Sequence, residues 1–86
     1  MNVGDVKITV RRGLQSTDAG RRTIETVGVD IADVTSRAGY TVYDSKHPEV
    51  EKAMACLREA AREVGLANRR IDATVEEANE FLKALG

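Results

Sequence analysis

Leu66-Ala67-Asn68-Arg69-Arg70-Ile71 is the stretch that decides the predicted fold, because an amphipathic helix precedes it and a strand is expected after it. The preceding segment opens at Pro48, stops near Gly65 and repeats apolar residues at alternating spacings of four and three: Val50, Met54, Leu57, Ala61 and Val64. After the stretch, apolar Ile71 and Ala73 alternate with Arg70 and Asp72, as in a strand with one buried face. The order helix, turn, strand follows.

The N-terminal half predicts a strand followed by a helix. Residues Val6–Val10 alternate apolar and polar side chains, which indicates a strand. Ser16-Thr17-Asp18 offers capping oxygens and Gly28 offers a stop, so a short helix is predicted over Asp18–Val27. Alternating β-branched residues also allow a strand there, so helix and strand both stay open for Arg21–Ile31.

Two further strands are expected before the long helix, over Ile31–Thr35 and Tyr40–Tyr43, joined as a hairpin by Ser36–Gly39. At the other end of the chain, Thr74 and Glu77 form a capping-box pattern that predicts a short terminal helix.

The element order predicts one α+β domain over residues 1–86, a ferredoxin-like β-α-β-β-α-β two-layer sandwich with a short C-terminal helix. Both helices would cover one face of the sheet. The open, polar face is the expected site where two protomers pair. A domain this small buries little of its surface, which also favours a homodimer or higher oligomer.

Composition argues against several functional classes. Thirteen basic and fourteen acidic residues leave a net charge of -1, which provides no electrostatic footprint for nucleic acid or an anionic membrane. The lone cysteine cannot form an internal disulfide, and we find neither a signal peptide nor a long apolar run. We therefore expect a cytoplasmic protein with no nucleic-acid or membrane partner.

Residues capable of chemistry are scarce. His47 precedes Pro48 at a helix start, where a turn residue is expected rather than a metal ligand. Cys56 falls beside the apolar face of the long helix and is interpreted as a half-buried structural thiol. Gly13 and Gly20 flank a loop, but no phosphate-binding motif accompanies them. No catalytic, metal or cofactor-binding residue is therefore predicted.

Several of these segments together resemble PurS, the small subunit of the formylglycinamide ribonucleotide amidotransferase. The resemblance covers about Val6 to Ala73, and it depends on the following stretches: Val6–Val10, Gly13, Gly20-Arg21-Arg22-Thr23-Ile24-Glu25, Asp33-Val34, Leu66-Ala67-Asn68 and Ile71. After Ile71 the chain departs from the alternating valines of that family, so a diverged paralogue serving another amidotransferase stays open.

The resemblance implies a non-catalytic subunit of a glutamine-dependent C–N ligase in purine biosynthesis. Such a subunit dimerises, bridges the large synthetase to the glutaminase and assists ammonia transfer, while ATP and Mg²⁺ bind the synthetase. By position, the residues expected to contact partners are Gly13, Asp18, Gly20, Arg21, Arg22, Asn68 and Arg69.

Two alternatives stay open. One is a stand-alone binding or inhibitory protein, phage- or plasmid-borne for example, that acts by protein–protein contact. The other, less favoured, is a nucleic-acid binder that uses Arg11, Arg12, Arg21 and Arg22, although three aromatic residues provide few stacking platforms.

Overall fold

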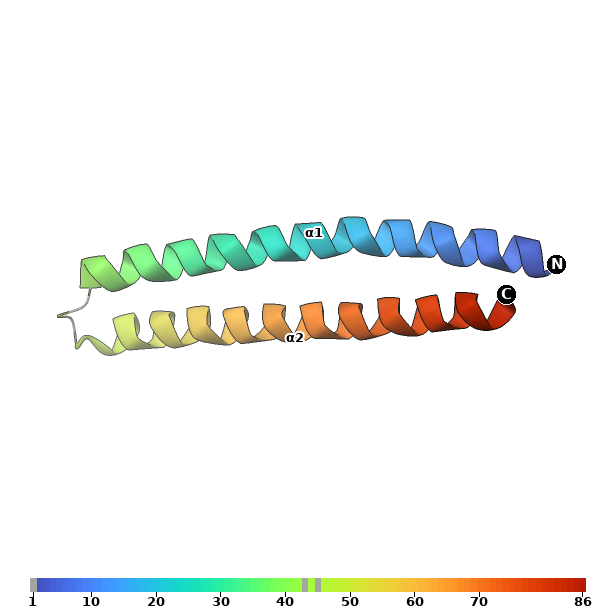
Figure 1. Cartoon of the computed structure of the whole chain (residues 1–86). Helices are drawn as coiled ribbons and strands as arrows, with labels where there is room; N and C mark the ends of the chain where they lie inside the picture. Colours follow the sequence, from blue (N-terminus) through green and yellow to red (C-terminus); the bar gives the residue numbers. More distant parts are fainter. Residues whose placement is uncertain (1, 43, 45) are drawn as a thin grey trace.

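The chain forms two long antiparallel α-helices in a computed structural model that describes residues 2–42, 44 and 46–86. Helix α1 spans Val3–Val42 and helix α2 spans Pro48–Leu85. They lie side by side along their whole length, with both termini at one end (Figure 1). The described part measures 63 × 16 × 15 Å, and its radius of gyration is 19.3 Å. A compact domain of this length would have a radius of gyration of about 12 Å, so the molecule is a rod.

The predicted ferredoxin-like α+β sandwich is wrong, because every regular element in the described residues is a helix. Val6–Val10 and Ile31–Thr35, predicted as strands, lie inside α1, and the predicted strand at Ile71 lies inside α2. Of the predicted strand at Tyr40–Tyr43, residues 40–42 are helical and Tyr43 lies outside the described residues. The segment left open, Arg21–Ile31, is helix in the middle of α1.

A seam of half-buried residues at alternating spacings of four and three joins the two helices. On α1 it consists of Val10, Leu14, Thr17, Arg21, Ile24, Gly28, Ile31, Thr35, Ala38 and Val42. On α2 it consists of Val50, Met54, Leu57, Ala61, Val64, Asn68, Ile71, Val75, Ala78, Leu82 and Leu85, all half-buried except Ala61. This is the heptad spacing of a coiled coil, and it runs straight through Leu66–Ile71. The turn predicted there is therefore absent.

The threonines that favoured strands adopt a helix-compatible conformation. Each of seven threonine hydroxyls donates a hydrogen bond to the carbonyl four residues earlier, over 2.7–3.3 Å: Thr9, Thr17, Thr23, Thr26, Thr35, Thr41 and Thr74. This bond satisfies the hydroxyl within the helix. Tertiary contact along the seam then overrides the weak β preference of these residues.

Side chains cap both helices at their N-terminal ends. The backbone N–H of Asp5 donates to Asn2 Oδ1 over 2.9 Å at the start of α1. At the start of α2, the Glu49 N–H donates to His47 Nδ1 over 3.1 Å, and Pro48 takes the first helical position. The predicted start at Pro48 is therefore confirmed, and His47, predicted as a turn residue, caps the helix.

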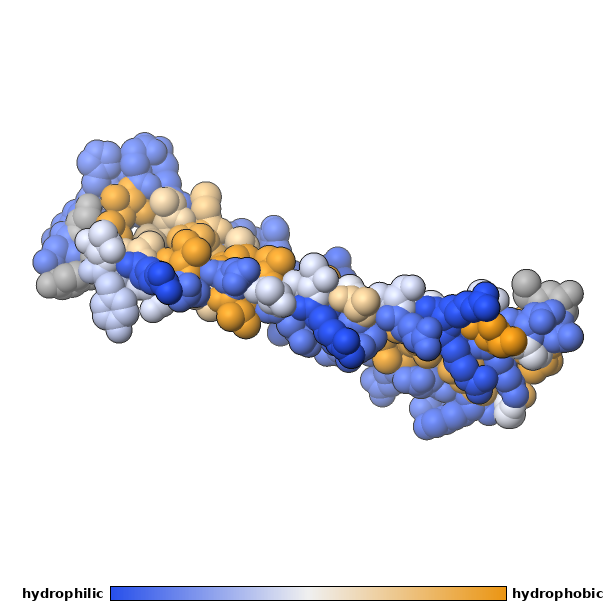
Figure 2. Space-filling model, turned by 90° about the horizontal axis from the view of Figure 1, so that it is seen from above, coloured by the Kyte–Doolittle hydropathy of each residue, from blue (hydrophilic) through white to orange (hydrophobic). Residues whose placement is uncertain are grey.

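None of the described residues is fully buried. The accessible surface is 6587 Å², against about 5,000 Å² expected for a folded monomer of 9.4 kDa. Seen from the α1 side, hydrophobic residues gather mainly over the half nearest the connection between the helices (Figure 2). Val29 and Tyr40, both in that half, are 67% and 82% exposed. The two helices alone thus leave much apolar surface in water.

Candidate protein-contact surface

A stripe of uncharged residues runs along one side of the hairpin. Its residues repeat every seven, and all of them except Val6 come one position before a seam residue. On α1 they are Val6, Gly13, Gly20, Val27, Val34 and Thr41, and on α2 they are Ala53, Ala60, Ala67, Thr74 and Phe81. We call these eleven residues the charge-free flank. All are apolar, small or hydroxyl-bearing, which widens the apolar stripe beyond that of a two-stranded coiled coil.

A groove shows that the two halves of the charge-free flank lie on the same side of the hairpin. Its volume is about 300 Å³, and it is lined by Ile24, Val27, Ile31, Ala60, Glu63, Val64 and Ala67. Val27 comes from the flank on α1, whereas Ala60 and Ala67 come from the flank on α2. Val27 is 43% exposed at this groove, and Phe81 is 47% exposed towards the free end of the flank. The flank is therefore an open, mainly apolar stripe shared by both helices, and the Glu63 side chain also lines its groove.

The opposite side of the seam is charged. Residues one position after the seam include Arg11, Asp18 and Glu25 on α1 and Glu51, Arg58 and Asp72 on α2. Arg21, a seam residue, reaches across to this side, and its guanidinium contacts the Asp72 carboxylate at 2.9 Å. The Arg21 side chain is 28% exposed and that of Asp72 is 64% exposed, so water screens the pair only in part. Charge therefore marks one flank and is missing from the other.

The register of the helices follows from cross-helix contacts. A Cβ placed on Gly28 would lie 3.3 Å from Val64 Cγ1, so these residues face each other. Arg21 and Asp72, one to two turns further along, agree with this pairing. Because the helices are antiparallel, the same register places Asn68 opposite Ile24.

Two polar atoms in this part of the seam are buried without a hydrogen-bond partner, namely Arg21 Nε and Asn68 Oδ1. Such an atom loses its hydration and gains nothing in return, which costs about 1–3 kcal/mol each. Arg21 and Asn68 therefore weaken the middle of the seam while fixing how the two helices align, as single polar seam residues do in coiled coils.

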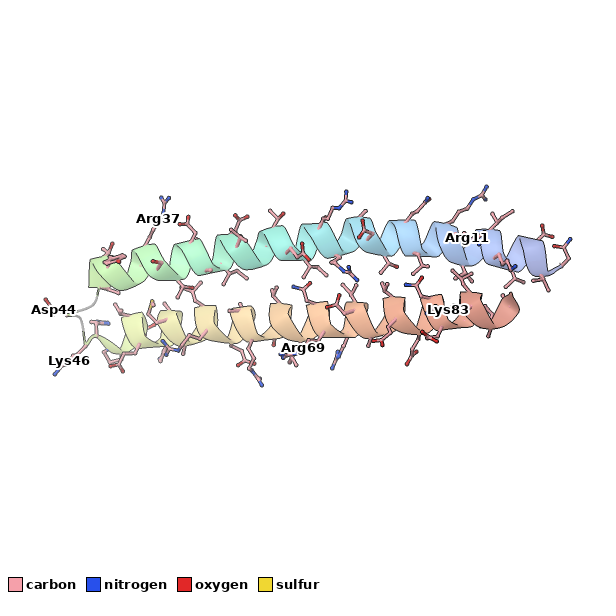
Figure 3. The ribbon with its side chains drawn as sticks, in the orientation of Figure 1. Arg11, Arg37, Asp44, Lys46, Arg69 and Lys83 are labelled. Atoms are coloured by element: carbon pink, nitrogen blue, oxygen red, sulfur yellow. The ribbon has the colours of Figure 1, made fainter. Side chains whose placement is uncertain are left out.

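The residues predicted to contact partners are distributed over three surfaces. Gly13 and Gly20 lie on the charge-free flank, and Arg21 and Asn68 lie in the seam. Asp18 and Arg22 form an exposed ion pair at 2.9 Å within α1. Arg69 is exposed and points away from α1 (Figure 3). The register does place the segment around Arg21 beside the segment around Asn68. Both segments are helical, however, whereas two loops were expected there.

The arginines of the nucleic-acid alternative are also divided. Arg21 and Arg22 each contact an aspartate, whereas Arg11 and Arg12 are exposed on α1. Pairing with carboxylates reduces the positive potential that phosphate binding requires. The positions of these arginines therefore add no support for nucleic-acid binding, which the composition already disfavoured.

The remaining chemically capable residues are isolated. Cys56 is exposed, so its predicted half-buried position is wrong, because it lies on the outer side of α2. Within the described ranges, no three His, Cys, Asp or Glu side chains gather as a metal site would require. Hydrogen bonds from Arg62 lower the pKa of the solvent-exposed Glu59 carboxyl. This ion pair within α2 supports the helix and indicates no catalytic function.

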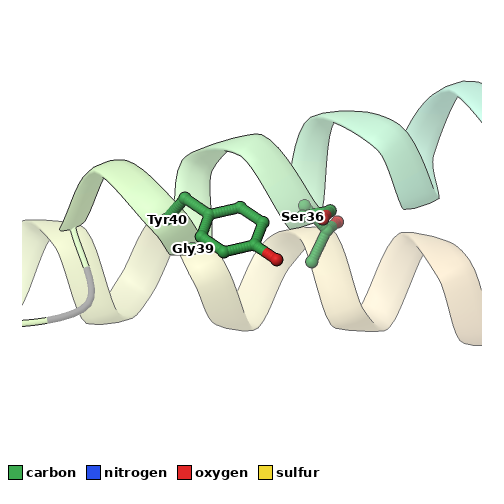
Figure 4. Close-up of a pocket in the computed structure, with 4 residues that line it drawn as sticks. Ser36, Gly39 and Tyr40 are labelled. Atoms are coloured by element: carbon green, nitrogen blue, oxygen red, sulfur yellow. The ribbon is translucent and has the colours of Figure 1, made fainter.

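A second hollow, of about 510 Å³, lies near the end of α1 and is lined by Thr35, Ser36, Gly39 and Tyr40 (Figure 4). The Tyr40 ring lies along the outside of the helix over neighbouring α1 residues, and α2 contributes nothing to the lining. The hollow is a feature of a single helix surface, unlike the groove of the charge-free flank, which both helices build.

The sequence reasoning missed the charge-free flank. Its signal was present, because a repeat of seven residues that avoids charge can be followed from Val6 to Thr41 and again from Ala53 to Phe81. The repeat is not visible in short windows of sequence that are judged only by the alternation of apolar and polar side chains.

Comparisons with other proteins provide no relative. Compared with family models, curated proteins and solved structures, the chain shows no match. Neither helix, over its described residues, has a stretch long and apolar enough to cross a membrane. The PurS resemblance stays a prediction, and the strands on which it depended are helical.

Proposed function

We propose that this protein acts by protein–protein contact in the cytoplasm, as a helical hairpin whose charge-free flank packs against other helices. The observation that carries the proposal is the flank itself, eleven positions without a charge in a chain with 31% charged residues. Exposed surfaces of soluble proteins are normally interspersed with charge, and a long apolar face marks an interaction site.

Energetics support a need for a partner. Two helices 40 and 38 residues long meet along one narrow seam in which no described residue is fully buried. The seam also contains two buried polar atoms without partners. Most helix stability in proteins comes from packing of an apolar face, so additional helices on the flank would supply what the hairpin lacks.

The amidotransferase role implied by the resemblance is one form of such contact. The elements that favoured it were strands and a loop, and in the structure these segments are helical. We therefore propose the contact role without assigning a synthetase or glutaminase as the partner.

Photo-cross-linking in the cells that produce the protein tests this proposal. A benzophenone-bearing amino acid at position 27 lies on the flank, and the same group at position 29 lies on the outer side of α1, where Val29 is more exposed. We expect protein adducts from position 27 and few from position 29. Equal yields from both positions, or none from position 27, would contradict the proposal.

A further inference from the structure

We propose that the helices packing on the charge-free flank belong to a second copy of this chain, so that the protein is a dimer of hairpins with four helices in one bundle. This inference rests on the proposed contact function and names the occupant of the same surface.

The area of the face suits such a dimer. The described part of the hairpin is 63 Å long and 16 Å wide. The whole side of the rod has a projected area on the order of 1,000 Å², and the flank is one stripe of it, so a partner must cover most of that side to reach the roughly 800 Å² per partner of a stable protein–protein interface. A second rod of the same length covers this face from end to end, whereas a compact partner would leave much of it in water.

Charge permits two copies to meet. The eleven residues of the flank are uncharged, so none of them brings like charges together when one copy is placed on another, and Glu63 is the charged residue among those that line the groove. The charged flank, in contrast, would place carboxylates and guanidinium groups of one copy against those of the other, which costs desolvation. The dimer therefore forms on the charge-free side, and the charged side faces water.

Side-chain size provides a further argument. The register set by Gly28 and Val64 places Phe81 near the level of Gly13, and it places Val27 and Val34 near the levels of Ala67 and Ala60. Large flank residues on one helix thus lie beside small ones on the other. When two such faces meet, large residues of each copy find room beside small residues of its partner, as close packing requires.

Sedimentation of the purified full chain tests the inference. We expect a mass twice the 9.4 kDa of one chain at micromolar concentration. Val27→Glu should weaken dimerisation at least 100-fold, because it buries a carboxylate in the interface. Val29→Glu makes the same chemical change two residues away, on the far side of α1, and should leave the mass unchanged. Helicity of both variants is checked by circular dichroism.

A second variant keeps the inference testable if Val27→Glu is partly unfolded. Val34→Glu lies seven residues along the same flank, and it should also be monomeric while its helicity matches that of the wild type. A wild-type chain that stays monomeric up to 100 μM would overturn the inference, as would an intact Val27→Glu dimer. If such a monomer still forms adducts with another protein through position 27, the proposed contact function is supported, and only the proposal that a second copy covers the flank is rejected.

Discussion

Replacing Asn68 by leucine should stabilise the protein, because Asn68 places a buried, unpartnered oxygen in the seam. Removing that oxygen recovers about 1–3 kcal/mol. The leucine side chain, half-buried as Asn68 is, adds about 1 kcal/mol of apolar burial against Ile24. We expect the free energy of unfolding to rise by about 3 kcal/mol, which for a chain of this size raises Tm by about 12–24 °C.

Asn79→Leu provides the matched control, since Asn79 is exposed on the same helix and the exchange gains the same helix propensity. Urea and thermal unfolding, followed by circular dichroism at 222 nm and at equal protein concentration, measure the difference. The reasoning is refuted if Asn68→Leu is no more stable than Asn79→Leu, because Asn68 would then have a partner or lie outside the seam.

Two further predictions concern the backbone and a surface ion pair. Gly65→Ala should raise the free energy of unfolding by about 1 kcal/mol, since helix propensity improves and a Cβ there meets nothing. Gly28→Ala should raise it by less than half as much, because its Cβ would crowd Val64. Equal gains for the two variants in urea unfolding would contradict the close approach of the helices at Gly28. Arg62→Gln should raise the pKa of Glu59 towards its ordinary value, as read by NMR titration of the carboxyl. Because the Glu59 pKa is lowered in the folded chain, the pair stabilises above the unfolded pKa and the effect disappears as pH falls through the folded pKa. A Tm difference between Arg62→Gln and wild type that persists at pH 2 would argue against this linkage.

The long second helix could be predicted in part from the sequence. Pro48 indicated its start correctly, and apolar spacing indicated the direction of its buried side. The predicted end near Gly65 was wrong, because Gly65 and Asn68 resemble residues that end a helix. In the structure the seam contacts on both sides of these residues outweigh the cost of a glycine and an asparagine inside a helix.

The first helix could not be recognised from short windows. Five residues such as Val6–Val10 fit a strand by alternation, and Val6 and Val10 also fall four apart, as on one side of a helix. Polar or small residues occupy several seam positions of α1, among them Thr17, Arg21 and Gly28, so apolar residues alone do not trace the seam. Only the spacing across forty residues distinguishes the two structures, and the charge-free flank becomes visible only once that spacing is known.

Thiol reactivity on the two sides of α1 tests the central claim most directly, namely that the charge-free flank is covered in the working protein. Val27→Cys and Val29→Cys are compared in a Cys56→Ser background, with maleimide labelling of the native protein as the measurement. In an isolated hairpin, residues 27 and 29 are 43% and 67% exposed, so their labelling rates would be similar. We predict that the thiol at position 27 reacts at least ten times more slowly and that dilution or Val34→Glu removes this protection. Equal rates in the undiluted protein would contradict the claim.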